Sequence, residues 1–122
     1  MLRVEDSETG SISRGTNASP FHTGVMGHLG TTASNQLLQN CDTLLLVGTN
    51  DPWTEFYPAP GQARAVQIDI DGRQLGVRYP VEVPLLGDAA ETLRALLAVV
   101  EPRDDRRWRE RVEALAPDRQ LI

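Results

Sequence analysis

The sequence contains no lysine, and all 12 of its basic residues are arginine. A Schiff-base lysine and a P-loop lysine are therefore both excluded. Cysteine occurs once, at Cys41, so the chain can form neither an internal disulfide nor a cysteine metal cage. The two histidines, His22 and His28, leave little for a zinc site. No segment has the roughly 20 consecutive apolar residues of a transmembrane helix, so we expect no membrane span.

The sequence also lacks an excess of positive charge. Its 122 residues carry a formal net charge of -5, which argues against a nucleic-acid-binding surface. A content of 40% apolar and 24% charged residues is ordinary for one globular domain. The first residues do not have the basic-then-apolar order of a signal peptide. Together with the single cysteine, these features predict a reduced, cytoplasmic protein.

The periodic part of the chain begins after a polar start. Residues 1–18 are rich in Ser, Thr, Gly and Asn without a hydrophobic period, which predicts a flexible leader. After it, the pattern predicts a helix over residues 31–40, strands over 43–47, 63–70 and 81–86, and helices that start at 88 and at 103. Short apolar strands alternating with helices indicate an α/β fold with a parallel sheet.

Particular residues support these elements. Thr31 or Thr32 can cap the first helix, and Asp88 can cap the helix that it begins. Pro84 marks the third strand as an edge strand. The continuous apolar run of residues 43–47 suits a central strand that is covered on both faces. The helix after residue 88 has a stripe that we expect to be buried, made of Leu93, Leu96, Leu97 and Val100.

Residues 24–30 place a glycine at every third position directly before the first helix. Such glycines let the backbone approach a ligand closely, and a helix N-terminus favours a phosphate. The spacing is not that of the dinucleotide fingerprint G-x-G-x-x-G, and no clear strand precedes it. A plain glycine turn is therefore the alternative.

Polar residues follow the first two predicted strands. Residues 48–52 leave the carboxyl end of the first strand, where open α/β sheets bind ligands. Thr49 and Asn50 can bond to sugar or phosphate oxygens, and an Asx-type turn before the proline is the alternative. Asp69 can accept hydrogen bonds from ribose, or it is a solvated carboxylate. Asp88 is first a helix cap and second a nucleotide contact.

Other residues suggest structure rather than chemistry. We expect Cys41 to be a small buried filler. Trp53, Phe56 and Tyr57 favour packing or an interdomain contact over stacking on a ligand. The arginines of residues 103–111 alternate with acidic residues, which is typical of a solvated helix face. We find no catalytic triad, no paired catalytic carboxylates and no metal site, so we assign neither catalytic residues nor metal ligands.

Five segments together resemble the central domain of thiamine diphosphate-dependent enzymes in order and spacing. The similarity is to the pyruvate oxidase, pyruvate dehydrogenase (quinone) and acetolactate synthase group, over residues 19–100. The segments that carry it are Gly24–Gly30, Cys41–Thr49, Val66–Asp71, Leu75–Gly76 and Pro84–Asp88. The resemblance implies a partial doubly wound parallel sheet of the Rossmann-like, FAD/NAD-binding type with flanking helices. In that group the domain lies between pyrimidine-binding and diphosphate-binding domains, and flavin-dependent members hold FAD in it.

The resemblance also implies which residues bind the cofactor. Those that would follow FAD along its length are Val25, Met26, Gly27, His28, Gly48, Thr49, Asn50, Asp51 and Pro52. Asp69 would meet the adenosine portion, and Asp88 would lie near it. The same positions stand out from their place in the predicted strands and turns, so the two arguments agree.

This sequence departs from the family pattern where thiamine diphosphate and Mg²⁺ would bind. Asp88 is followed by Ala89 rather than by the second glycine of the Gly-Asp-Gly motif, and the domain with the activating glutamate is absent. We therefore expect residues 19–100 to be a partial central domain and residues 101–122 a charged helix or linker toward a missing third domain. Thiamine diphosphate and Mg²⁺ would belong only to the full-length enzyme, which other domains or another chain would complete.

The expected role is thus that of a part of a 2-oxo acid decarboxylating flavoenzyme, one that is not catalytic alone. A free-standing FAD or adenine-nucleotide binding module is one alternative, and a structural remnant that binds nothing is the other. The sequence leaves homo-oligomer formation open.

Overall fold

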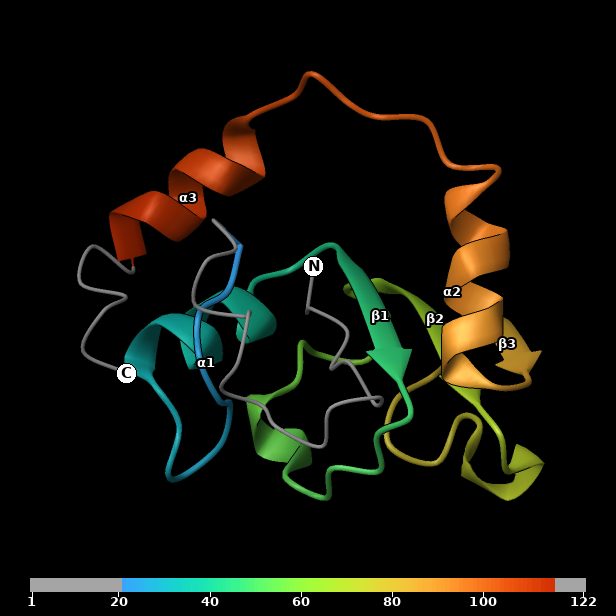
Figure 1. The fold of residues 1–122 in the computed structure, drawn as a ribbon. Helices are drawn as coiled ribbons and strands as arrows, with labels where there is room; N and C mark the ends of the chain where they lie inside the picture. The colour runs from blue at the N-terminus through green and yellow to red at the C-terminus, as the bar shows by residue number, and fades with distance from the viewer. Residues whose placement is uncertain (1–20, 116–122) are drawn as a thin grey trace.

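The computed structural model describes residues 21–115, so the predicted leader over residues 1–18 lies outside the described residues (Figure 1). The parallel strands alternate with helical segments along the chain. In order, the elements are α1 (Thr32–Gln39), β1 (Thr43–Val47), η1 (Thr54–Phe56), β2 (Arg64–Asp69), η2 (Gly72–Gln74), β3 (Val83–Leu86), α2 (Ala89–Leu97) and α3 (Arg107–Leu115), where η denotes a 3-10 helix.

The three strands form one parallel sheet in the order β1-β2-β3. Leu45 of β1 is paired in register with Val66 of β2, and Ile68 of β2 with Leu85 of β3. The predicted α/β fold with a parallel sheet and flanking helices is therefore confirmed. The third strand lies at an edge, as the proline at position 84 indicated.

The prediction that the first strand is central is wrong for the part of the chain that the structure describes. There β1 pairs with β2 alone, and β2 is the middle strand. Leu44 and Leu46 are buried, whereas Leu45 and Val47 on the opposite face are half-buried. A continuous apolar run predicts that other parts of the chain cover both faces of a strand. It does not predict that the strand has hydrogen-bonded neighbours on both sides.

The helices α1 and α2 each begin with a side-chain cap. The Thr31 side chain accepts a hydrogen bond from the Ser34 backbone N–H at the start of α1. The Asp88 carboxylate accepts from the Glu91 N–H at 2.9 Å at the start of α2. Each cap satisfies a backbone donor that the first helical turn leaves free, so both predicted helix starts are confirmed.

The main core lies between α1 and the face of β1 that carries Leu44 and Leu46. Trp108 of α3 packs against this cluster, and α3 contacts α1 on the same side of the molecule (Figure 1). Val112 of α3 is also buried, so this helix packs through the face that carries Trp108 and Val112. The cluster consists of Leu38, Cys41, Leu44, Leu46, Tyr57, Ala63, Ala65 and Tyr79.

The predicted burial of the α2 stripe is only partly correct. Helix α2 packs against β2, and Leu93 and Leu96 are half-buried there (Figure 1). Leu97 is 77% exposed and Val100 is 56% exposed. The helix ends at Leu97, so Val100 is no longer on its stripe. The apolar spacing identified an amphipathic helix correctly, but only part of its apolar face finds a partner among the described residues.

The hydroxyl of Tyr79 joins two loops inside the core. It accepts a hydrogen bond from the Ala63 N–H at 3.1 Å and donates one to the Ala59 carbonyl at 2.8 Å. Tyr79 is 3% exposed, so water cannot replace these bonds. The tyrosine thereby fixes the turn that leads into β2.

We expect Tyr79→Phe to lower the free energy of unfolding by about 1–3 kcal/mol, because the buried Ala63 N–H would lose its partner. Urea denaturation followed by circular dichroism measures this change. Tyr57→Phe is the matched control, since its hydroxyl only donates to the Asp51 carbonyl. If Tyr79→Phe were as stable as the unmodified chain, the hydroxyl would not hold the turn.

Candidate functional site

The glycine-spaced segment forms a closed loop against the start of α1. The side chain of Asn35 binds both ends of Gly27, accepting from its N–H at 2.8 Å and donating to its carbonyl at 3.0 Å. The Thr31 N–H donates to the Val25 carbonyl and the Gly30 N–H to the Gly27 carbonyl. Gly27 has a φ of +101°, a conformation that glycine adopts at little cost. The glycine pattern is thus required by a turn, whatever ligand the loop binds.

The aromatic segment after β1 packs onto this loop. The ring of Trp53 lies so close to Gly27 that an added Cβ atom would come within 2.3 Å of Trp53 Cε3. His28 meets Trp53 and Phe56 edge to face, with ring centroids 5.6 and 4.9 Å away. His28 Nε2 lies 2.7 Å from Glu55 Oε1. These contacts connect the first predicted cofactor segment to the chain that follows the second.

A backbone hydrogen bond and the contact with His28 together lower the pKa of the Glu55 carboxyl group. Both partners of this pair are more than half exposed, so the contact contributes little to stability. Its effect is to hold the exposed His28 ring in one place. Val25 is also exposed, whereas Met26 packs against the main core.

The second predicted segment, residues 48–52, leaves β1 beside the end of β2. The Gly48 N–H donates to the Ile68 carbonyl at 2.9 Å. Asp51 Oδ1 accepts from the Trp53 N–H at 3.0 Å, which is the Asx-type turn that we raised as the alternative. Asn50 is exposed, and its Oδ1 atom accepts from Arg78 Nε at 2.8 Å. The turn and a ligand-binding role are compatible, because the turn uses Asp51 and leaves Asn50 exposed and Thr49 half-buried.

The Tyr57 side chain stabilises this turn through a hydrogen bond. Its hydroxyl donates to the Asp51 carbonyl at 3.1 Å. Burial raises the pKa of Tyr57 to about 12, with Asp51 adding to the rise and Arg78 opposing it. The phenol therefore keeps its proton, and its hydrogen bond to the loop, at every physiological pH.

Asp69 and Asp88 stand at the ends of β2 and β3. Asp69 is 9% exposed, so the alternative of a solvated carboxylate is wrong. Its Oδ1 atom accepts from the Asp71 N–H at 2.8 Å. The Asp69 carbonyl accepts from the Gly87 N–H, which brings the end of β2 next to the start of α2. Asp88 caps α2, as expected, and is exposed.

The carboxyl ends of the three parallel strands lie at one edge of the sheet (Figure 1). This edge carries the loop of residues 48–52 together with Asp69 and Asp88. The loop of residues 24–30 reaches it through Trp53. Arg78 is a residue of this edge that the sequence analysis does not single out. Nothing in the sequence distinguishes it from the other arginines; its contact with Asn50 spans 28 positions.

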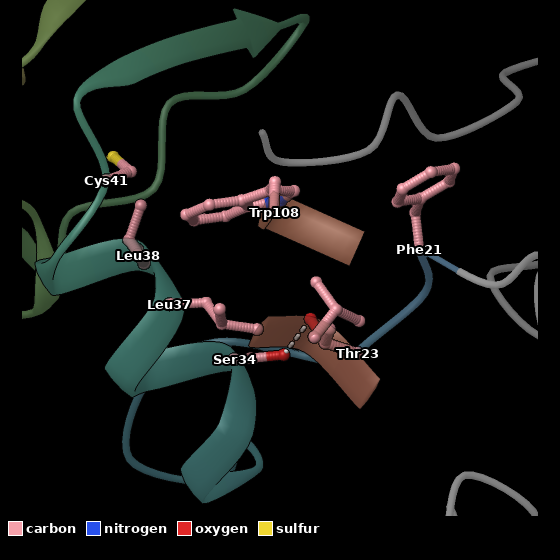
Figure 2. A pocket seen from close by; sticks show the side chains of 8 residues that line it. Phe21, Thr23, Ser34, Leu37, Leu38, Cys41 and Trp108 are labelled. Atoms are coloured by element: carbon pink, nitrogen blue, oxygen red, sulfur yellow. Dashed lines mark hydrogen bonds between the residues drawn. The ribbon is translucent and has the colours of Figure 1, made fainter. Parts of the chain in front are cut away.

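A small cavity lies away from these residues, between α1 and α3 (Figure 2). Its volume is about 20 Å³, which leaves room for about one water molecule but not for a nucleotide. The Thr23 and Ser34 hydroxyls on its wall are 2.8 Å apart. Cys41 on the same wall is 3% exposed, and burial raises the pKa of its thiol, as expected for an unreactive filler. The remaining lining residues are Phe21, Leu37, Leu38, Trp108 and Val112.

Between residues 21 and 115, no cluster of three or more His, Cys, Asp or Glu side chains could hold a metal ion. Over the same residues, no helix is long and apolar enough to cross a membrane.

Comparison with known protein families identifies the family of this chain. A sequence model described as "Thiamine pyrophosphate enzyme, central domain" matches residues 12–96. The chain belongs to this family. Its parallel sheet and flanking helices are therefore a thiamine pyrophosphate enzyme central domain. The match starts at residue 12, before the domain start at residue 19 that the motifs predicted.

Curated relatives agree with this family. The chain is 35% identical over 89 residues to the putative thiamine pyrophosphate-containing protein YdaP of Bacillus subtilis, covering 73% of this chain and 15% of the relative. It is 36% identical over 90 residues to the pyruvate oxidase of Lactiplantibacillus plantarum, with coverages of 73% and 15%. It is 36% identical over 103 residues to a probable acetolactate synthase large subunit of Methanocaldococcus jannaschii, with coverages of 79% and 17%. This central domain thus spans only a small part of the length of each of these relatives.

Proposed function

We propose that this central domain belongs to a thiamine diphosphate-dependent flavoenzyme that decarboxylates a 2-oxo acid, and that it contributes FAD binding and interdomain structure. The carboxyl edge of the sheet carries the proposal, because it gathers residues 48–52, Asp69 and Asp88 where α/β sheets bind nucleotides. The similarity to a pyruvate oxidase and to a probable acetolactate synthase supports a 2-oxo acid as the substrate.

Asp69 fits the ribose of an adenine dinucleotide. Its Oδ1 atom is used by the Asp71 N–H, and Oδ2 has no hydrogen-bond partner among the described residues. A carboxylate oxygen in this position can accept from a ribose hydroxyl. Gly48 has a φ of +58°, and no atom lies within 4 Å of the position of an added Cβ atom, so a ligand can approach the backbone there.

The loop of residues 24–30 would hold a second part of FAD. Its candidate residues differ in exposure: Val25 and His28 face solvent, whereas Gly27 is buried beneath Trp53. Backbone groups near Val25 and the exposed His28 ring are therefore the parts that a ligand would meet. When bound, FAD supplies electron-transfer chemistry, which is a property of the cofactor itself.

We propose that catalysis depends on groups outside this central domain. The Gly-Asp-Gly start of the thiamine diphosphate motif is absent from the sequence, since Ala89 follows Asp88. We propose that pyrimidine-binding and diphosphate-binding domains, in the same protein or in another chain, hold thiamine diphosphate and Mg²⁺. We also propose a cytoplasmic location for the assembled enzyme.

An FAD titration tests the proposal. We expect FAD fluorescence to be quenched saturably by the folded chain, and FAD to raise its melting temperature with concentration. Asp69→Asn keeps an oxygen for the Asp71 N–H but removes a ribose acceptor, so we expect about tenfold weaker binding. Asp71→Asn is the matched control, because it makes the same charge change at a carboxylate paired with Arg73.

The outcomes separate the proposal from its alternatives. A folded chain that does not bind FAD would be a structural part without a flavin site. If Asp69→Asn and Asp71→Asn bound FAD with equal affinity, Asp69 would not be part of the FAD site. The FAD affinity of the isolated chain can also be measured after the thiamine-binding domains of a relative are added. An unchanged affinity would favour a free-standing nucleotide-binding module.

A further inference from the structure

Arg78 reaches the carboxyl edge of the sheet from the connection between η2 and β3. It is half-buried, and its Nε atom donates to Asn50 Oδ1 at 2.8 Å. This contact ties the connection to the loop that leaves β1. The guanidinium group is thereby placed beside residues that we propose for FAD binding.

Unlike Arg64 and Arg73, Arg78 does not face a carboxylate partner within the described residues. Among the described residues, Arg64 pairs with Glu82 at 2.7 Å and Arg73 with Asp71 at 2.9 Å. The partner of Arg78 is a neutral amide, and no carboxylate of the described part of the chain forms an ion pair with it. The bond to Asn50 uses Nε and leaves the two terminal nitrogens as donors. Arg78 therefore brings a cationic donor group to the proposed cofactor edge.

The backbone on both sides of Arg78 is held firmly. Gln67 is 1% exposed, and its side chain donates to the Gln74 carbonyl and accepts from the Gly76 N–H at 2.8 Å. On the other side, the hydroxyl of Tyr79 is bonded to two backbone groups in the core. Arg78 therefore starts from a fixed backbone, which reduces the entropy lost when its side chain binds a ligand.

We propose that Arg78 binds a phosphate group of the dinucleotide at this edge, with Asn50 orienting its guanidinium. The donor fork of arginine matches two phosphate oxygens, which lysine cannot reproduce. This inference rests on the proposed FAD-binding function and adds to it a residue and the part of the ligand that it contacts. Arg78 is an orienting and affinity-determining residue of the nucleotide site rather than a catalytic one.

The test compares the FAD affinity of the whole chain with that of three variants. We expect Arg78→Gln to weaken FAD binding at least about tenfold, and Arg78→Lys to weaken it less, because lysine keeps the charge but loses the fork. Arg64→Gln is the matched control: it removes an exposed arginine at the opposite end of β2, and we expect less than about a twofold change. Added NaCl should weaken binding by the unmodified chain more than binding by Arg78→Gln.

Each outcome is decisive. If the unmodified chain binds FAD and Arg78→Gln binds it equally well with the same salt dependence, the Arg78 inference is overturned while the FAD function stands. If the folded, unmodified chain binds no FAD, the proposed function fails and the inference fails with it. If Arg78→Gln does not fold, the test rests on Arg78→Lys. An FAD affinity of Arg78→Lys equal to that of the unmodified chain would overturn the inference that the guanidinium group binds two phosphate oxygens.

Discussion

Gly27→Ala is expected to lower the free energy of unfolding by about 2–5 kcal/mol. Two effects contribute to this loss. The φ of +101° at Gly27 is unfavourable for any residue with a Cβ atom. The new Cβ atom would also lie 2.3 Å from Trp53 Cε3, so the indole ring would have to move. Chemical denaturation monitored by Trp fluorescence and circular dichroism measures the change.

Gly61→Ala separates the two effects. Gly61 also has a positive φ, of +84°, but an added Cβ atom there meets nothing within 4 Å. We therefore expect this control to show the backbone effect alone, at about 1–2 kcal/mol. If Gly27→Ala were no more destabilising than Gly61→Ala, the contact with Trp53 would not constrain the loop. In a Trp53→Ala background, the difference between the two glycine variants should shrink.

The same substitution also bears on function. Movement of Trp53 would displace the ring that joins residues 24–30 to the loop after β1. We expect Gly27→Ala to weaken FAD binding as well as stability, whereas Gly61→Ala should leave the affinity unchanged. If Gly27→Ala and Gly61→Ala differed in stability but bound FAD equally well, the glycine loop would contribute to the fold and not to cofactor binding.

Leu44→Ala is expected to destabilise the chain by about 3–5 kcal/mol. Leu44 is 0% exposed and belongs to the main core cluster between β1 and α1. Truncation removes apolar contacts and leaves a cavity that a strand held by the sheet ladder cannot easily close. Urea denaturation with two probes, fluorescence and circular dichroism, measures the loss and tests whether unfolding remains cooperative.

Two other leucines provide the controls for Leu44→Ala. Leu45 is the next residue of β1 and points to the opposite, half-buried face, so Leu45→Ala should cost less than Leu44→Ala. Leu97 is 77% exposed, and its truncation should change stability by no more than about 0.5 kcal/mol. Equal effects at positions 44 and 45 would contradict the assignment of the core to one face of β1.

The sequence by itself determined the features that depend on neighbouring residues. The first strand runs over Thr43–Val47 as predicted, and Thr31 and Asp88 cap their helices. A short apolar run and a side chain three positions from a free N–H act over a few residues, so the pattern contains all the information needed. The family resemblance, too, depended on ordered segments that are visible in the sequence.

Only the tertiary structure decided which of these elements meet. It placed β1 at the edge of the described sheet, left Leu97 in solvent and buried Asp69. It also joined Asn50 to Arg78 across 28 positions. Such pairings depend on how connecting loops pack, and no local period encodes them, because a side chain's exposure is set by whatever the rest of the chain lays against it.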